Sequence, residues 1–277
     1  KMNVVEATGL TKKFGSFTAV DSLDLSIKRR AVFGLLGPNG AGKTTTIAML
    51  STMLAPTSGT ASVNGFDVSI QPQQVRQSIG VVFQDPSLDS RLTAEENMQL
   101  HADLYSVPDA TAADKIPRLL ELVGLHERAK DFVKTYSGGM KRRLELARAL
   151  IHEPRVLFLD EPTIGLDPQT RLHIWDYIKK TSAKHNIAIL LTTHYMEEAE
   201  SLCNRIAIMD GGRIIALDSP QGLVKKIGTQ VIRVTADSIE NAKKLAEFPR
   251  SKNTVVVEKN VVFRVSSDVH MMQELLS

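Results

Sequence analysis

A glycine-rich segment carries the clearest chemical signal in this sequence. Residues 37–44 fit the pattern G-x-x-x-x-G-K-[ST]. The glycines allow backbone N–H groups to turn inward around phosphate oxygens, and a following helix presents its positive end to the same anion. We expect Lys43 to hold the β- and γ-phosphates of a nucleotide and the Thr44 hydroxyl to bind Mg²⁺, which needs hard oxygen ligands. The residues predicted to contact the nucleotide here are Gly37, Pro38, Asn39, Gly40, Ala41, Gly42, Lys43, Thr44 and Thr45.

Two adjacent carboxylates supply the second part of a phosphate site. Asp160 and Glu161 follow the apolar run Val156–Leu159, which reads as a buried strand. At the last strand position, Asp160 suits a metal shell, whereas Glu161 can point at a water in line with the γ-phosphate, as general base or orienting group. An apolar strand that ends in acid is a weak signal alone. Paired with the glycine loop, it predicts a P-loop NTPase.

A second helix start also suits an anion. Ser137, Gly138 and Gly139 precede an amphipathic pattern, so a hydroxyl and two glycine amides stand at a helix N-terminus. In isolation, a serine-capped helix after a glycine turn is the plainer interpretation.

A short basic run, Lys141-Arg142-Arg143, follows this second helix start. Such a run can indicate nucleic-acid binding. Because Glu145 and Arg148 lie on the same predicted helix, we interpret the run as a solvated face instead.

Strands and helices alternate around these residues. The buried strand Val32–Leu36 precedes the glycine loop, and the helical stretch Lys43–Leu54 follows it. Further short apolar strands separated by helices predict a mostly parallel sheet with helices on both faces, an α/β fold. The further strands are Ile79–Phe83, Val156–Leu159, Ile187–Leu191 and Arg205–Met209, and the helices between them include Arg171–Ala183 and Glu197–Cys203.

Three other regions surround this core. Strands Val4–Thr8 and Ser22–Ile27, with a hairpin about Asn64-Gly65, predict an N-terminal antiparallel β subdomain. From about 86 to 152 the apolar period is 3.6, which predicts a helical insert. Residues 220–277 read as a small C-terminal α+β domain, with strands Gln230–Thr235, Thr254–Val257 and Val261–Val265 and helices Ile239–Phe248 and Asp268–Leu276.

Composition excludes several classes of protein. The 277 residues carry 34 Lys+Arg against 31 Asp+Glu, and the net charge of +3 is too small to argue for nucleic acid. The apolar runs fall short of the ~18–20 residues that cross a bilayer. The single cysteine, Cys203, cannot form an internal disulfide and fits a reducing cytosol. We therefore expect a cytoplasmic protein without a membrane span.

Six elements in this order resemble the ATP-binding cassette (ABC) family, the nucleotide-binding subunits of ABC transporters. They are the aromatic Phe14, the glycine loop, Gln84, a signature at Ser137–Met140, the Asp160-Glu161 pair and His194. The resemblance covers about residues 3–220, and we assign 1–219 to an ABC ATPase domain with its helical subdomain at about 86–152. The resemblance implies ATP and Mg²⁺ as cofactors.

The resemblance also implies roles for the matched residues. Phe14 would stack on adenine, Gln84 would contact Mg²⁺ and the attacking water, and His194 would contact the γ-phosphate. Asp167 would pair across a dimer in which Ser137, Gly138 and Gly139 bind the γ-phosphate held by the other protomer. The predicted catalytic residues are then Lys43, Gln84, Glu161 and His194, and the predicted metal ligands are Thr44, Gln84 and Asp160.

Three functions from different classes are compatible with a glycine loop of this kind. An ATPase that drives a separate membrane permease is favoured, and a soluble ABC-type ATPase acting on nucleic acid or ribosomes is the alternative. Only 92 residues lie between Thr44 and Ser137, whereas chromosome-type relatives insert long coiled coils there. A small-molecule kinase would fit the glycine loop but not the signature.

Two positions depart from the common family pattern. Met140 replaces a frequent glutamine, and the signature resembles the branch that serves two-component exporters of drugs, antibiotics and polysaccharides. Ile164 replaces a small hydroxyl residue and would affect packing at the dimer seam. The expected partners are an integral-membrane permease, docked at Asp85–Asn97 and neighbouring helices, and a second ATPase copy or paired ATPase, without nucleic acid. The chain would then lie on the cytoplasmic face of the cell membrane.

Overall fold

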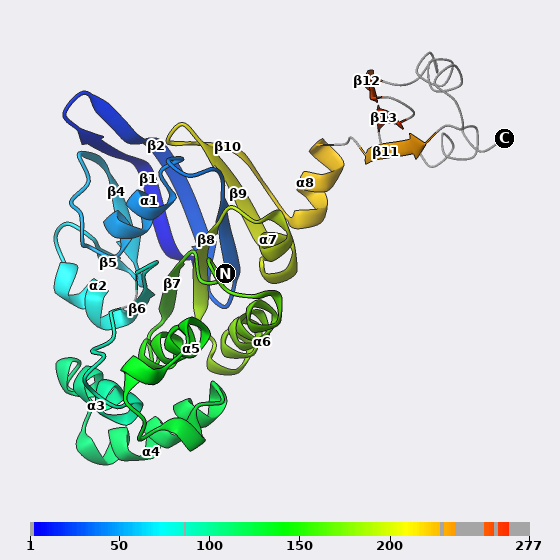
Figure 1. Cartoon of the computed structure of the whole chain (residues 1–277). Helices are drawn as coiled ribbons and strands as arrows, with labels where there is room; N and C mark the ends of the chain where they lie inside the picture. Colours follow the sequence, from blue (N-terminus) through cyan, green and yellow to red (C-terminus); the bar gives the residue numbers. More distant parts are fainter. Residues whose placement is uncertain (1–2, 86, 228–229, 236–251, 258–259, 266–277) are drawn as a thin grey trace. The chain divides into compact units, whose positions relative to one another are not determined.

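The computed structural model describes residues 3–85, 87–227, 230–235, 252–257 and 260–265. The chain divides into two compact units, 1–220 and 221–277 (Figure 1). In the second unit, three antiparallel strands form a sheet in the order β11-β13-β12, and they confirm the three strands expected there. The helices expected at 239–248 and 268–276 lie outside the described residues. The bounds here are α8 (Pro220–Ile227), β11 (Gln230–Thr235), β12 (Lys252–Val257) and β13 (Asn260–Val265).

A six-stranded sheet forms the centre of the first unit, in the order β10-β9-β3-β8-β7-β6. Five strands run parallel, as expected, and β10 adds an antiparallel edge. Strand β10 was not predicted from the sequence. It pairs with β9 through a Gly211-Gly212 turn with φ of 52° and 80°, values that suit a two-residue hairpin. The strands are β3 (Val32–Leu36), β6 (Ile79–Val82), β7 (Val156–Asp160), β8 (Ala188–Thr193), β9 (Arg205–Asp210) and β10 (Arg213–Asp218).

Helices cover this sheet. Every residue of β3, β7 and β8 is buried, which is why these strands are mostly apolar rather than alternating. The polar exceptions, Asp160, Thr192 and Thr193, lie at the carboxyl ends of β7 and β8. Contacts join α1 to β7, α2 to β6, and α7 to both β3 and β8. The helices are α1 (Lys43–Leu50), α2 (Pro72–Ser78), α6 (Pro168–His185) and α7 (Met196–Leu202).

The first of these helices is shorter than the sequence predicted. It ends at Leu50 instead of Leu54, because Thr52 adopts a left-handed φ of 67°. The amides of Met53 and Leu54 then turn back to the Ala48 carbonyl, at 2.9 and 3.0 Å. This local turn ends the helix before the apolar periodicity does.

A four-stranded antiparallel sheet confirms the expected N-terminal β subdomain, in the order β2-β1-β4-β5. Its first two strands are longer than predicted, because register shifts along their pairing interrupt the alternation that marks a strand in sequence. They form one hairpin about Gly15-Ser16, in which Phe14 pairs with Phe17. The strands are β1 (Asn3–Phe14), β2 (Phe17–Lys28), β4 (Ser58–Val63) and β5 (Phe66–Asp67).

A helical insert follows β6, as expected. Figure 1 shows α3 and α4 gathered at the end of the first unit away from the β1–β2 hairpin. Helix α5 contacts both and leads back into β7. The elements are α3 (Ala94–Leu104), α4 (Asp109–Leu122), η1 (His126–Arg128), η2 (Val133–Thr135) and α5 (Gly138–Arg148). None of the helices in the described part of the chain combines the length and apolar composition needed to cross a bilayer.

A cluster of three aromatic rings joins this insert to the central sheet. The Tyr105 ring stacks on His152 with centroids 3.8 Å apart, and His101 lies 4.8 Å from Tyr105. His152 Nε2 lies 2.8 Å from the Ile79 carbonyl oxygen of β6. Burial, with the nearby charge of Arg148, lowers the pKa of His101 to about 3, and burial also lowers the pKa of His152.

These shifts predict that folding stability decreases as the pH falls below 6.5. Between pH 6.5 and pH 3, His101 is protonated in the unfolded chain but neutral in the folded chain. Its contribution to the free energy of unfolding is therefore complete above pH 6.5 and is lost as the pH falls toward 3. For His101 the loss between pH 6.5 and 5 is on the order of 1–2 kcal/mol, allowing for its partial exposure. Urea unfolding at both pH values measures it. His101→Phe should reduce the difference while the exposed control His126→Phe does not, and equal pH dependence in both variants would contradict the assignment.

Candidate functional site

The carboxyl ends of four parallel strands meet at one edge of the central sheet. Register pairs Leu36 of β3 with Thr193 of β8, and Asp160 of β7 with Thr192. Strand β6 pairs with β7 as far as Val82 and Leu159. Short connections after these strands carry the glycine loop, Gln84, Glu161 and His194, so residues far apart in sequence gather at one edge. Open parallel sheets place their ligand sites at this edge.

A pocket of about 320 Å³ lies here, within the size range of small-molecule sites. The glycine loop, the β1–β2 hairpin and the ends of β6 and β7 contribute its walls. The lining residues are Phe14, Phe17, Ala19, Asn39, Gly40, Gly42, Lys43, Thr44, Thr45, Gln84 and Glu161. The structure therefore brings most of the predicted nucleotide and catalytic residues around one cavity.

At two positions of the loop, the neighbouring backbone leaves no room for a side chain, so only glycine fits. A Cβ on Gly37 would lie 2.2 Å from the Met209 carbonyl oxygen, and a Cβ on Gly42 would lie 2.5 Å from that of Ala19. Gly42 also has a φ of 98° and is the N-cap of α1. Since glycine has no side chain to cap the first turn of α1, the amides there can donate to an external anion.

Lys43 is buried, and its ammonium is held inside the loop. Its Nζ donates to the carbonyls of Gly37 and Pro38, at 2.8 and 3.0 Å. The same Nζ lies 3.6 Å from Glu161 Oε1, and the two side chains are only 5% and 8% exposed. A buried ion pair thus joins the glycine loop to the end of β7.

Thr192 organises the two carboxylate residues. Its Oγ1 accepts a hydrogen bond from the Glu161 N–H at 2.9 Å and donates to Asp160 Oδ1 at 2.5 Å. Glu161 has a left-handed φ of 46°, which is uncommon for a residue with a side chain. His194 Nδ1 lies 3.4 Å from Glu161 Oε1. The Glu161 carboxylate therefore faces Lys43 and His194. The Asp160 carboxylate instead accepts a hydrogen bond from Thr192 of β8.

The oxygen donors at this edge fit a hard divalent cation. Thr44 and Gln84 line the pocket and offer a hydroxyl and an amide oxygen. Asp160 offers a carboxylate and is 1% exposed at the end of β7. Oxygen ligands of these types are what Mg²⁺ prefers in proteins.

A second aromatic residue, Phe17, also lines this pocket and was not predicted from the sequence. The hairpin register sets it opposite Phe14. Phe14 is 50% exposed and Phe17 is 63% exposed. Lys12 Nζ lies 5.2 Å from the centroid of the Phe14 ring. The available signal was the spacing of two phenylalanines about the two-residue turn Gly15-Ser16.

The predicted signature and Asp167 stand apart from this pocket, whose lining includes none of them. Ser137 caps α5 by accepting from the Met140 N–H at 3.3 Å. Asp167 caps α6 by accepting from the Thr170 N–H at 2.9 Å. Hydrogen bonding with Thr170 lowers the pKa of the Asp167 carboxyl. A Cβ on Gly139 would lie 2.6 Å from Thr170 Cγ2, so the two helix starts are neighbours. The predicted site residues thus form two groups.

The interpretation of the charge run as a solvated face is wrong. Arg142 is 7% exposed and Glu145 is 1% exposed. The signal that could have revealed this is helical spacing, because these two positions share a face of α5 with the buried Leu146 and Ala149. Their charges are satisfied inside the fold rather than by water.

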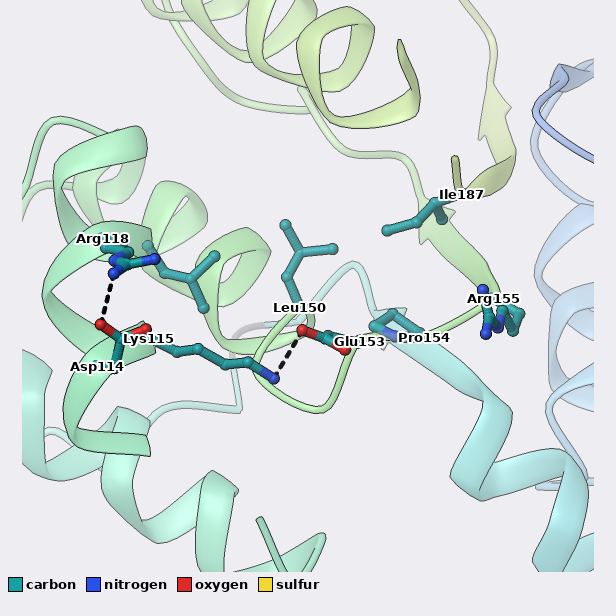
Figure 2. A pocket seen from close by; sticks show the side chains of 9 residues that line it. Asp114, Lys115, Arg118, Leu150, Glu153, Pro154, Arg155 and Ile187 are labelled. Carbon is teal, nitrogen blue, oxygen red and sulfur yellow. Dashed lines mark ion pairs between the residues drawn. The ribbon is translucent and has the colours of Figure 1, made fainter. Parts of the chain in front are cut away.

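Another cavity, of about 470 Å³, opens between α4 and the segment that leads into β7. Figure 2 shows its two ion pairs, Lys115 with Glu153 at 2.9 Å and Arg118 with Asp114 at 2.6 Å. The motif residues lie elsewhere, and these cations already have acidic partners. We therefore assign the chemistry to the edge of the central sheet.

Comparison with known proteins agrees with this assignment. The family model described as ABC transporter matches residues 20–164. The linearmycin resistance ATP-binding protein LnrL of Bacillus subtilis (strain 168) is 40% identical over 240 residues, which cover 86% of this chain and 77% of that protein. The chain belongs to the ABC transporter family. It is an ATP-binding ATPase of that family, as the resemblance implied.

Two other relatives of this ABC protein carry export or resistance names. The Nod factor export ATP-binding protein I of Ralstonia nicotianae (strain ATCC BAA-1114 / GMI1000) is 44% identical, covering 85% of this chain and 74% of that protein. The daunorubicin/doxorubicin resistance ATP-binding protein DrrA of Streptomyces peucetius is 42% identical, covering 89% and 73%.

Solved structures support the same fold. An ATP-binding subunit of an ABC transporter aligns with a TM-score of 0.73 and 28% identity, over 81% of this chain and 93% of that chain. An ATP-binding cassette solved as a dimer in a post-hydrolysis state with ADP and Pi aligns with a TM-score of 0.71 and 25% identity, over 78% and 98%. The predicted P-loop NTPase fold of this ABC chain is thereby confirmed.

The contacts of Thr192 generate a testable prediction for this ABC ATPase. Thr192→Val should leave the affinity for ATP within about threefold but slow hydrolysis by about tenfold, because Asp160 and Glu161 each lose a hydrogen bond worth about 1 kcal/mol. Steady-state hydrolysis and nucleotide titration measure the two quantities. Thr181→Val, on α6 and also buried, is a control away from the pocket. Equal effects of the two variants would contradict the role of Thr192.

Proposed function

We propose that this chain is the ATP-hydrolysing subunit of an exporter, which dimerises head-to-tail on ATP and drives a separate integral-membrane permease. The convergence of Lys43, Glu161 and His194 beside the glycine loop is the observation that carries the proposal. The named relatives favour a drug, an antibiotic or another amphiphilic or polymeric substance as the exported substrate.

In this mechanism, the loop amides and the start of α1 bind the ATP phosphates. The Lys43 ammonium exchanges its contacts with the Gly37 and Pro38 carbonyls for phosphate oxygens. Glu161, released from its ion pair with Lys43, orients the attacking water or accepts its proton. His194 contacts the γ-phosphate. Phe14 and Phe17 flank the adenine through their exposed rings.

A divalent cation is part of the same proposal. Thr44, Gln84 and Asp160 would hold Mg²⁺, which when bound neutralises negative charge on the phosphates. Thr44, on α1, and Gln84, after β6, line the pocket, and Asp160 is the buried last residue of β7.

The second group of residues completes the site in a dimer. Ser137, Gly138 and Gly139 would bind the γ-phosphate held by the partner, and Asp167 would pair across the interface. Their separation from the pocket within one chain supports this arrangement, because two anion-binding helix starts then serve one nucleotide.

Domain roles and location follow from the same proposal. Residues 1–219 would form the ATPase domain, with a helical subdomain at about 86–152, and residues 220–277 a separate small domain. The permease would dock at Asp85–Asn97 and neighbouring helices; on α3, Leu104 is 73% exposed. The chain would lie on the cytoplasmic face of the cell membrane. Burial of Arg142 removes the basic run that could have supported the nucleic-acid alternative.

Two variants separate binding from hydrolysis. Glu161→Gln should bind MgATP normally but hydrolyse it about a hundredfold more slowly, because the base or water-orienting group is lost. Lys43→Ala should weaken ATP binding itself by about tenfold or more, because a charged phosphate contact is lost. Isothermal titration and phosphate release measure both effects. Near-normal turnover in pure Glu161→Gln would refute the role of Glu161.

A mixing experiment tests the shared site. The free chain should be monomeric, and Glu161→Gln should dimerise with ATP but not with ADP, as measured by light scattering. Lys43→Ala and Ser137→Arg should each be inactive alone. Their mixture should regain activity, because one site of the heterodimer joins an intact loop to an intact signature. Full activity of Ser137→Arg alone would rule out the shared site.

A further inference from the structure

Arg142 makes an unusual set of contacts inside the protein. Arg142 is 7% exposed. Its guanidinium donates to three successive carbonyls at the end of β7, those of Asp160, Glu161 and Pro162, at 2.9, 3.1 and 2.8 Å. It also donates to the carbonyl of Phe83, the residue before Gln84. One side chain of α5 therefore holds the backbone beside both proposed catalytic residues.

Glu145, one turn further along α5, extends this contact to the other side of Gln84. Its carboxylate lies 3.3 Å from Arg142 Nη1 and accepts from the Ser87 N–H at 2.8 Å. Arg148 on the same helix donates to the Ser87 carbonyl at 3.0 Å. The segment that carries Gln84 is thus held from α5 at Phe83 and at Ser87.

Arginine suits this place for a physical reason. Its planar guanidinium has five N–H donors and keeps its charge when buried, so it can bond several carbonyls and a carboxylate together. A lysine has three donors on one nitrogen and cannot span carbonyls from two segments in the same way.

We propose that Arg142, paired with Glu145, is a positioning residue that ties the Gln84 segment to the Glu161 loop and sets the rate of hydrolysis. The inference rests on the proposed roles of Gln84 and Glu161 in ATP hydrolysis. Because α5 begins at the Ser137–Gly139 signature, its movement would reach both catalytic segments through these two side chains.

A neighbouring arginine offers a matched control. Arg143 lies on the same helix and also donates to backbone carbonyls, those of Val123 and Gly124 at 2.8 and 3.4 Å. These carbonyls lie at the end of α4, away from Gln84 and Glu161. A merely structural need for arginine in α5 would therefore affect both positions alike.

The single tryptophan provides a spectroscopic reporter. Trp175 Nε1 donates to Glu198 Oε1 at 2.9 Å, and the same oxygen accepts from Thr163 Oγ1 at 2.7 Å. Thr163 follows Pro162, whose carbonyl Arg142 holds. A shift of this loop should therefore change the emission of Trp175.

The experiment compares Arg142→Met with Arg143→Met in the full-length chain. Arg142→Met should lower kcat for ATP by about tenfold or more, with KM and ATP affinity within about threefold, and should shift the Trp175 emission. Arg143→Met should keep kcat within about twofold and leave the emission unchanged. The same loss of kcat in both variants, or a normal kcat in Arg142→Met, would overturn the proposal.

A second variant covers the case in which Arg142→Met does not fold because Glu145 is left buried and unpaired. Arg142→Met/Glu145→Met removes both charges together, which buried pairs tolerate better than the loss of one partner. Slow hydrolysis with intact ATP binding in the double variant supports the proposal, and normal hydrolysis overturns it. Absence of ATP hydrolysis by the wild-type chain would instead refute the proposed function itself.

Discussion

The parallel register of β3, β8, β7 and β6 is the constraint on which the rest of the structure depends. Every residue of β3, β7 and β8 is buried, so a one-residue slip in pairing would turn each side chain to the opposite face of the sheet and disrupt the packing on both faces. With the register fixed, strand ends that are far apart in sequence finish at one edge of the sheet. The site is therefore a consequence of how the core packs, and its loops need to be only a few residues long.

Two buried ion pairs fix the loops and helices around this sheet. Lys43 with Glu161 joins the glycine loop to β7, and Arg142 with Glu145 joins α5 to the segments after β6 and β7. Buried charges are costly unless they are paired and hydrogen-bonded, and here carbonyl oxygens complete both pairs. Such pairs specify one arrangement of segments that the apolar core alone would not distinguish. The core thus sets the fold, and the ion pairs set the alignment of its loops.

Local patterns in the sequence were enough for the main elements and for much of the site. The glycine loop lies between β3 and α1 as predicted, because strand, loop and helix are contiguous. Arg142 was misread because its burial depends on carbonyls at Phe83 and at residues 160–162, which local charge patterning does not reveal. Phe17 was missed because only the hairpin register brings it beside Phe14. Most of what escaped was tertiary pairing, although two local features, the Gly211-Gly212 hairpin into β10 and the turn that ends α1, were also missed.

The internal contacts of Lys43 bear on which anions the loop can select. With Nζ bonded to the Gly37 and Pro38 carbonyls and close to Glu161, the cation is already solvated by the protein. An incoming anion must replace these oxygens, and a small monovalent ion such as chloride offers too few acceptors to do so. A polyphosphate brings several charged oxygens on one molecule and can replace them together. Under the proposed function, these internal contacts would make the loop favour multiply charged ligands over simple salt ions.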